Sequence, residues 1–353
     1  MTGEPSPAAP LPAARPLTGE AALLSRILPR LALPSLAADG RVEVGPGDDA
    51  AVVRLPSDRL VVTTDTLVEG FDFLPHATTP AWIGRKAAVQ NLADVAAMGA
   101  RPLALVVALS APADTPPGTL EQLSAALAEQ AAADGAHVVG GDLGRADRLT
   151  LTVTALGAMG HGDTPVLRSG GRAGDVLAIG SDRLGRSAAG LALILAGRAR
   201  VAPDGAVALE GIRTPGAADL VRHHDAPEVD LSLGWSAGRT AHAMMDLSDG
   251  LVRDGRRLAA ASQVAIDLDP AALEDDVRVL AALADELGTD PATDPWDWVL
   301  HGGEEHAMLA AFAPGEVPVG FRPVGRLLPA GPAGPSLTLG GREVAGEGFD
   351  HFG

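Results

Sequence analysis

The sequence contains neither cysteine nor tyrosine, and Lys86 is the only lysine among its 353 residues. The absence of cysteine excludes disulfides, thiolate metal sites and a cysteine nucleophile. It also fits a reducing compartment, so we expect a cytoplasmic protein. Aromatic residues make up only 3% of the chain, so alanine, leucine, valine and isoleucine must form most of the interior.

Basic residues are few relative to acidic ones: 27 Lys and Arg against 45 Asp and Glu give a formal net charge of −18. A chain this acidic binds the phosphate backbone of nucleic acids poorly, so we expect no DNA or RNA partner. The longest apolar run, PLALVVALSAPA from Pro102, is too short to cross a bilayer, and we expect no membrane association. Residues 1–17 lack the basic start and apolar stretch of a signal peptide, and they predict a disordered leader.

Common phosphate and nucleophile motifs are also missing. No Gly-x-x-x-x-Gly-Lys-Ser/Thr pattern occurs, which excludes a P-loop, and no Gly-x-Ser-x-Gly elbow occurs either. A Ser/His/Asp triad is not excluded by counting residues. GPGDDA at residues 45–50 resembles a dinucleotide fingerprint, but its carboxylates would repel a pyrophosphate. Arg257 stands where an EF-hand after Asp246 would need its bidentate glutamate. The adjacent His223 and His224 are expected at the surface of a polar loop.

Strand and helix patterns alternate along the chain. Helices are expected over residues 20–31, 80–100, 118–136 and 185–197 and after residue 251, with strands over 41–44, 50–55, 60–66, 103–110, 137–142, 149–160, 265–269, 297–300 and 306–312. The loop-rich stretch 161–180 suggests a domain boundary near residue 165. The fold class is therefore predicted as α+β with two domains, residues 18–165 and residues 166–353.

Acidic residues recur at the ends of apolar segments without an adjacent base. They are Asp48, Asp49, Asp65, Asp94, Asp142, Asp246 and Asp249. Each alone has a structural explanation, because aspartate is common in turns and helix caps, and Asp246 or Ser248 could cap the helix starting at Leu251. Asp94 is harder to explain, since it lies inside an apolar helical pattern where a carboxylate is costly. Together the set predicts a site for Mg²⁺, which prefers oxygen ligands.

Seven motifs in order, GDDAAVV, TTDTLVEG, NLADVAAMGARP, GGD, LRSGGRAGD, MDLSDGL and HGGEE, resemble the thiamine-monophosphate kinase family. That family lies in the superfamily that also holds aminoimidazole ribonucleotide synthetase and selenophosphate synthetase. The resemblance runs from Glu20 to the terminal GFDHF. It implies an N-terminal domain with a mixed sheet that forms a homodimer, and a C-terminal α/β sandwich domain. It also implies that ATP gives its γ-phosphoryl group to thiamine monophosphate, yielding thiamine diphosphate. Because the acceptor phosphate is already mostly a dianion and needs no strong base, we expect direct transfer without a phosphoenzyme.

The resemblance also implies roles for individual residues. Those matching the ligands of several Mg²⁺ ions are Asp49, Thr63, Thr64, Asp65, Asp94, Asp142, Asp246 and Asp249. Those matching ATP contacts are Gly141, Asp142, Arg168 and Ser248. Glu304 and Phe349 match positions that hold the thiamine moiety, through its amino group and its cationic ring respectively.

Two departures from the family pattern fall on the substrate side. Asp72 stands where the family has histidine, and it could attract the thiazolium cation, repel the acceptor phosphate or be a solvated loop residue. The usual GGEDYEL reads GGEEHAM, which places His306 and Ala307 at altered positions. Two other functions therefore stay open: an ATP-dependent superfamily member that activates and cyclises an amide, and a nucleotide-binding protein without kinase activity.

Overall fold

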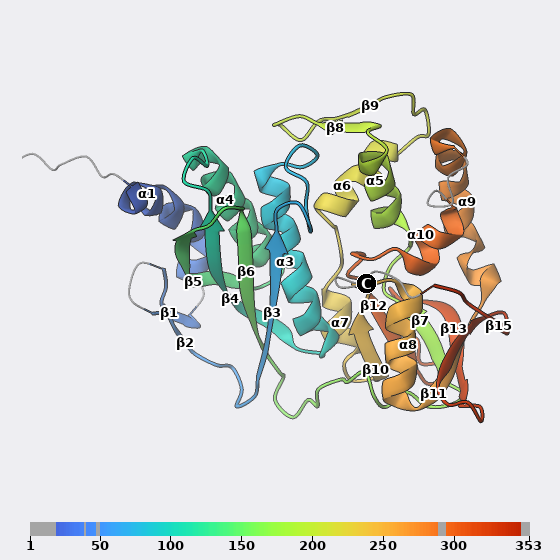
Figure 1. The fold of residues 1–353 in the computed structure, drawn as a ribbon. Coiled ribbons are helices and arrows are strands. Elements are labelled where there is room, and N and C mark those ends of the chain that lie inside the picture. The colour runs from blue at the N-terminus through green and yellow to red at the C-terminus, as the bar shows by residue number, and fades with distance from the viewer. Residues whose placement is uncertain (1–18, 39, 47–49, 289–293, 347–353) are drawn as a thin grey trace, which may run out of the picture.

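The computed structural model describes residues 19–38, 40–46, 50–288 and 294–346. Two mixed sheets organise this part of the chain (Figure 1). The first has the strand order β3-β6-β4-β5, in which β4 and β5 are parallel and the other neighbours antiparallel. Its strands are β3 (Leu60–Val68), β4 (Arg101–Ala111), β5 (His137–Arg145) and β6 (Thr150–Ala158). The short pair β1 (Val42–Val44) and β2 (Val52–Val53) forms a separate two-stranded sheet that packs against the buried Leu103, Ala104 and Val139 of β4 and β5.

Helices cover only one face of the first sheet. α3 (Pro80–Ala97) and α4 (Pro117–Ala133) pack against that face, and α1 (Gly19–Leu31) packs against α4. α3 begins with Pro80 in its first turn, where the side chain of Thr79 accepts a hydrogen bond from Trp82 N. The opposite face stays open: Leu60, Val62 and Val106 are 42%, 57% and 38% exposed. The first sheet therefore has one face covered by helices and a second face that β1 and β2 cover only in part.

The second sheet has seven strands in the order β10-β12-β7-β13-β11-β14-β15, with β11 and β14 parallel and the other neighbours antiparallel. The strands are β7 (Val176–Ile179), β10 (Ala241–Asp246), β11 (Val264–Leu268), β12 (Met308–Phe312), β13 (Arg322–Pro329), β14 (Ser336–Leu339) and β15 (Arg342–Glu343). The remaining elements are α2 (Pro34–Ala38), α5 (Arg186–Leu195), β8 (Ala199–Val201), β9 (Val207–Leu209), α6 (Ala217–Asp225), α7 (Ser232–Ala237), α8 (Leu251–Ser262), α9 (Pro270–Leu287) and α10 (Pro295–His301). The prediction of an α+β fold is confirmed.

α3 lies between the two sheets and joins their cores. It contacts β3 and β6 on one side and β10 and α7 on the other. The close approach of α7 needs a glycine, because a Cβ at Gly234 would come within 2.3 Å of Ala96 O in α3. The last strand of the first sheet ends at Ala158, and the second sheet begins at Val176. One cluster of buried side chains nevertheless includes residues from both sides of this connection, such as Leu92 and Phe312. The boundary near residue 165 stays a prediction.

Two expectations about local structure were wrong. Residues 297–300 belong to helix α10 rather than to a strand, because Asp294 caps the helix by accepting from Trp296 N and Pro295 opens its first turn. His223 and His224 lie in helix α6 and are buried, only 7% and 6% exposed, instead of lying in a surface loop. No helix in the described ranges is long and apolar enough to span a membrane.

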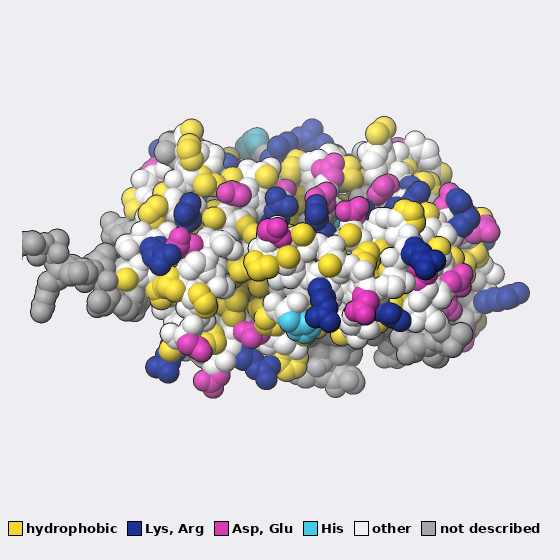
Figure 2. All heavy atoms as spheres, turned by 90° about the horizontal axis from the view of Figure 1, so that it is seen from above, with side chains coloured by type: hydrophobic (Ala, Val, Ile, Leu, Met, Phe, Trp, Pro, Cys, Tyr) yellow, Lys and Arg dark blue, Asp and Glu magenta, His cyan; other side chains and the backbone are white. Residues whose placement is uncertain are grey.

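Charged side chains of both signs are interspersed over the face seen in Figure 2. On that face, the excess of acidic residues is not gathered into a single patch.

Candidate active site

Two cavities meet beside α3. The first has a volume of about 760 Å³ and lies between α3, α5, the loop after β3 and residues 301–306. The second, of about 980 Å³, lies between the start of β3, the end of α3, residues 165–169 and the end of β10. Three residues, Asp94, Arg168 and Asp246, line both cavities. The two cavities therefore share a wall that carries two carboxylates and a guanidinium group.

Strand alternation sorts the residues of the TTDT motif onto two faces. Thr63 and Asp65 face α3: Thr63 Oγ1 donates to Asp94 Oδ2 at 2.7 Å, and Asp65 N donates to Asn91 Oδ1 at 3.0 Å. Thr64 faces the open side of the sheet, where its hydroxyl donates to Val153 O at 2.9 Å. The structure thus brings Thr63, Asp65 and Asp94 together and leaves the side chain of Thr64 on the other face.

Burial and neighbouring negative charge raise the pKa values of Asp65 and Asp94 near the shared wall. Burial raises the pKa of Asp94 to about 6, and the charge of Asp246 adds to the shift. Burial also raises the pKa of Asp65, and Asp246 again contributes. Asp246 ends β10, and its Oδ2 lies 3.4 Å from His306 Nδ1. Although burial opposes it, Asp246 raises the pKa of His306. A group of carboxylates with this mutual repulsion favours binding of a cation.

Asp249 already has a cationic partner on the following helix. Its Oδ2 lies 2.6 Å from Arg257 Nη1 and 3.6 Å from Arg253 Nε, and its backbone N–H donates to the buried Asp254. Neither Asp246 nor Ser248 caps α8, because the cap position is Gly250. Gly250 has a φ of +108°, and a Cβ there would meet His301 O at 2.7 Å. Ser248 and Asp249 both line the first cavity.

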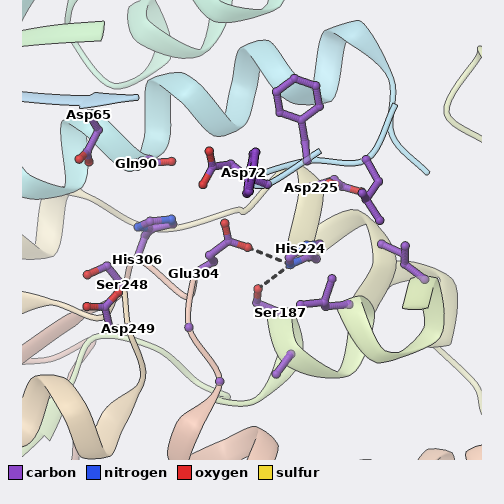
Figure 3. Close-up of a pocket in the computed structure, with 18 of the residues that line it drawn as sticks. Asp65, Asp72, Gln90, Ser187, His224, Asp225, Ser248, Asp249, Glu304 and His306 are labelled. Atoms are coloured by element: carbon purple, nitrogen blue, oxygen red, sulfur yellow. Dashed lines mark hydrogen bonds and ion pairs between the residues drawn. The ribbon is translucent and has the colours of Figure 1, made fainter. Parts of the chain in front are cut away.

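Glu304 is held between a lysine and a histidine. Lys86 is 1% exposed, and its Nζ lies 2.8 Å from Glu304 Oε1 and donates to Asp72 O at 2.9 Å. His224 Nδ1 lies 3.1 Å from Glu304 Oε2 and 3.0 Å from Ser187 Oγ (Figure 3). Burial opposes ionisation of Glu304, but Lys86 and His224 hold its pKa below the usual value. The carboxylate is therefore ionised and positioned at neutral pH.

Burial, together with the Lys86 charge, lowers the pKa of His224 to about 4. The unfolded chain therefore takes up a proton at this position between pH 6.5 and pH 4 while the folded chain does not, so acidification over this range lowers stability. We expect His224→Gln to reduce this loss by about 3 kcal/mol, the equivalent of the pKa difference. Chemical denaturation of both proteins at a series of pH values measures the free energy of unfolding and its loss on acidification. The control is His161→Gln, a change at an exposed histidine. Equal pH dependence of stability in the His224→Gln and wild-type proteins would contradict the expectation.

Other residues singled out in the sequence have different positions. Asp72 lines the first cavity, but its Oδ2 accepts from Val68 N at 2.7 Å and so also closes the turn after β3. Arg168 is exposed. Gly141 and Asp142 lie on β5, at the opposite edge of the sheet from β3, and line neither cavity. Asp49 and Phe349 lie outside the described residues.

Sequence reasoning did not identify His224 and Asp225, which line the first cavity. It also missed Lys86, which forms an ion pair with the cavity residue Glu304. A lone lysine inside the apolar pattern of residues 80–100 was a usable signal, because an unpaired ammonium is costly there. For His224 and Asp225, nothing in the local pattern distinguishes them from an ordinary polar segment.

Known proteins with similar sequences indicate the family to which this chain belongs. The family model of the AIR synthase related protein, N-terminal domain, matches residues 47–159. A thiamine-monophosphate kinase of Mycobacterium tuberculosis H37Rv is 43% identical over 337 residues, covering 95% of this chain and 92% of that protein. The thiamine-monophosphate kinase of Corynebacterium glutamicum is 41% identical over 285 residues, covering 80% of each.

Solved structures show the same similarity in three dimensions. The thiamine-monophosphate kinase of Stenotrophomonas maltophilia superposes with a TM-score of 0.72 at 28% identity, covering 92% of this chain and 98% of that one. A structure described as AaThiL complexed with AMPPCP and TMP also gives 0.72, at 26% identity, covering 95% of this chain and 97% of that one. The sequence motifs, the fold and these relatives agree: the chain belongs to the thiamine-monophosphate kinase family.

Proposed function

We propose that this protein transfers the γ-phosphoryl group of ATP to thiamine monophosphate and releases thiamine diphosphate and ADP. The observation that carries the proposal is the wall shared by the two cavities, at Asp94, Arg168 and Asp246. Two ligands in adjacent cavities would bring their phosphates together at this wall. The similar structure described as complexed with AMPPCP and TMP supports binding of a nucleotide and TMP by the same protein.

We assign ATP to the second cavity and thiamine monophosphate to the first. The second cavity has apolar side chains suited to an adenine ring, including Met98, Met159 and Leu167. The first has an apolar wall, which suits a heterocycle, and it also has the hydroxyl of Ser248 and the guanidinium group of Arg168, which can donate to phosphate oxygens. Arg168 lines both cavities, and its planar guanidinium group can bind phosphate oxygens on either side.

The acceptor needs no strong base, because a phosphate monoester has a second pKa near 6 and is mostly a dianion at neutral pH. The obstacle is repulsion: two unit charges 4 Å apart repel by roughly 4 kcal/mol at an effective dielectric constant near 20. Bound Mg²⁺ would supply the positive charge that neutralises and aligns the phosphates. Asp65, Asp94 and Asp246 would hold it, with Thr63 keeping one oxygen of Asp94 in place.

The metal assignment is based on chemistry rather than on a preformed site. In the described part of the chain, no three His, Asp or Glu side chains form a ready metal-binding cluster. The donor set nevertheless fits a hard cation, because it consists of oxygens, and burial raises the pKa values of Asp65 and Asp94. We expect binding of nucleotide and Mg²⁺ to draw these side chains together.

Mass spectrometry tests the reaction. Incubation of the full chain with ATP, Mg²⁺ and thiamine monophosphate should give thiamine diphosphate and ADP in equal amounts. ADP release with formylglycinamidine ribonucleotide but not with thiamine monophosphate would favour the amide-activating alternative. Mg²⁺-dependent ATP binding by calorimetry, without a product, would favour the non-catalytic alternative. A protein labelled by γ-labelled ATP without acceptor would contradict direct transfer.

The proposal includes a cytoplasmic homodimer formed through the open face of the first sheet. That face carries the exposed Val62 and Val106, and Thr64 and Asp142 also face it by strand register. Two residues that line neither cavity would thus lie at the interface between two copies. We expect a dimeric mass by sedimentation and a shift toward monomer in Val62→Glu, because a buried charge without a partner is costly. A monomeric wild-type chain at micromolar concentration would contradict the dimer.

A further inference from the structure

Asp225 is a buried carboxyl group without a described partner for one of its oxygens. It is the last residue of α6, is 2% exposed and lines the first cavity. Its Oδ2 is buried and has no hydrogen-bond partner among the described residues. In the view of Figure 3 it lies beyond Glu304, at the opposite end of the cavity from Asp65 and Asp249. A group in this position is expected to find its partner in a ligand.

Apolar side chains surround this end of the first cavity. They are Phe71, Leu74, Ala188, Leu191, Ile194 and Leu195. A flat ring fits such a wall, and a single polar group within it would fix the orientation of that ring. The phosphate of the same ligand would lie at the other end, near the shared wall.

Glu304 is less suited to this role than its sequence motif implies. One of its oxygens is paired with Lys86 at 2.8 Å and the other with His224 at 3.1 Å. A ligand amino group would have to share each of these oxygens with a partner that is already in place. Asp225 has an oxygen available, and burial raises the pKa of Asp225 to about 7, with Lys86 opposing the shift. A large fraction of the carboxyl group is therefore protonated at neutral pH.

A protonated carboxyl group presents an O–H donor beside a C=O acceptor. The 4-aminopyrimidine edge presents the complementary pair, an amino donor beside a ring-nitrogen acceptor. We propose that Asp225 recognises the aminopyrimidine ring of the acceptor through these two hydrogen bonds, and so selects thiamine monophosphate over other phosphate esters. The inference rests on the proposed function and assigns a specificity residue to it.

Two variants at Asp225 and one substrate analogue test this pairing. Asp225→Asn keeps a donor beside an acceptor without charge, whereas Asp225→Leu has similar size and neither group. The analogue is the monophosphate of 3′-deazathiamine, in which the ring nitrogen beside the amino group is replaced by CH. Steady-state kinetics with saturating ATP give KM and kcat for each protein with each acceptor. Asp219→Asn, an exposed change on the same helix, is the matched control.

We expect Asp225→Leu to raise KM for thiamine monophosphate by about 10- to 100-fold, the usual cost of losing a buried hydrogen-bonding partner. KM for ATP should stay unchanged, and Asp225→Asn should remain within about threefold of the wild type. The wild type should prefer thiamine monophosphate over the analogue by about 10-fold or more, and Asp225→Leu should lose that preference.

A preference retained by Asp225→Leu would overturn the inference, and so would a wild type that does not distinguish the two acceptors. The wild-type comparison can overturn the inference even if Asp225→Leu fails to fold, and Asp225→Asn, which keeps both hydrogen-bonding groups, should then retain the preference. These results differ from failure of the proposed function, in which the wild type would turn over neither acceptor.

Discussion

Replacing Asp94 by asparagine is expected to lower kcat by about 100- to 1000-fold, the range seen when one group that stabilises transition-state charge is removed. Asp94 lines both cavities, and its Oδ2 is already held by Thr63 Oγ1 at 2.7 Å. The amide keeps the size of the side chain and removes the negative charge that Mg²⁺ requires. The concentration of Mg²⁺ needed for half-maximal rate should rise in the same variant. Both quantities are measured by following ADP release at increasing Mg²⁺ concentrations.

Two comparisons separate a metal effect from a general loss of structure. Asp65→Asn should behave like Asp94→Asn, because Asp65 lies on the face of β3 that points toward α3, which carries Asp94. Asp65 also lines the first cavity. Asp285→Asn, an exposed change on α9, should leave the kinetics unchanged. Melting temperatures of Asp94→Asn and Asp65→Asn equal to or above that of the wild type would show intact folding. Substantial residual activity in both would be strong evidence against the metal assignment.

The largest expected loss of stability follows from replacing Lys86 by methionine. The side chain of Lys86 is 1% exposed and that of Glu304 is 30% exposed, so the change leaves a partly buried carboxylate without its ammonium partner. Removal of one member of a buried pair costs 3–5 kcal/mol, and the partial exposure of Glu304 reduces this to about 2–3 kcal/mol. Urea denaturation measures the free energy of unfolding. KM for thiamine monophosphate should also rise, because Lys86 Nζ binds both Glu304 and the backbone of Asp72 in the cavity wall.

The double change Lys86→Met with Glu304→Gln provides the matched test. It removes the unpaired charge as well as the cation, so stability should recover by more than half relative to Lys86→Met alone. If the single and double variants were equally unstable, the loss would come from packing around residue 86 and not from the ion pair.

The sequence predicted the elements with strong periodic patterns and the carboxylates of the shared wall. Asp65 and Asp94 come together because β3 and α3 are long elements whose apolar faces determine how they pack. The side on which each residue lies follows from strand alternation, and this separates Thr64 from Thr63 and Asp65. The positions of Asp49 and Phe349 remain predictions.

The rest of the first cavity could not be derived from local patterns. Lys86, His224 and Glu304 come from three segments far apart in the sequence, so their contact depends on the packing of α3, α6 and the chain before β12. Helix α10 was mistaken for a strand because it is only 7 residues long and rich in β-favouring tryptophan and valine. The Asp-Pro pair at its start was a stronger indicator than its composition.

The isolation of the single lysine gives this protein an internal reporter. Lys86 is the only lysine in the chain, and it is covered by the surrounding helices and loop, so acylating reagents that attack amines reach its side chain only when this region opens. The rate at which residue 86 becomes labelled, followed by peptide mass, therefore measures how often α3 and the chain before β12 separate. A bound acceptor that closes the cavity should slow that labelling, so ligand affinity can be read from one side chain without an activity assay.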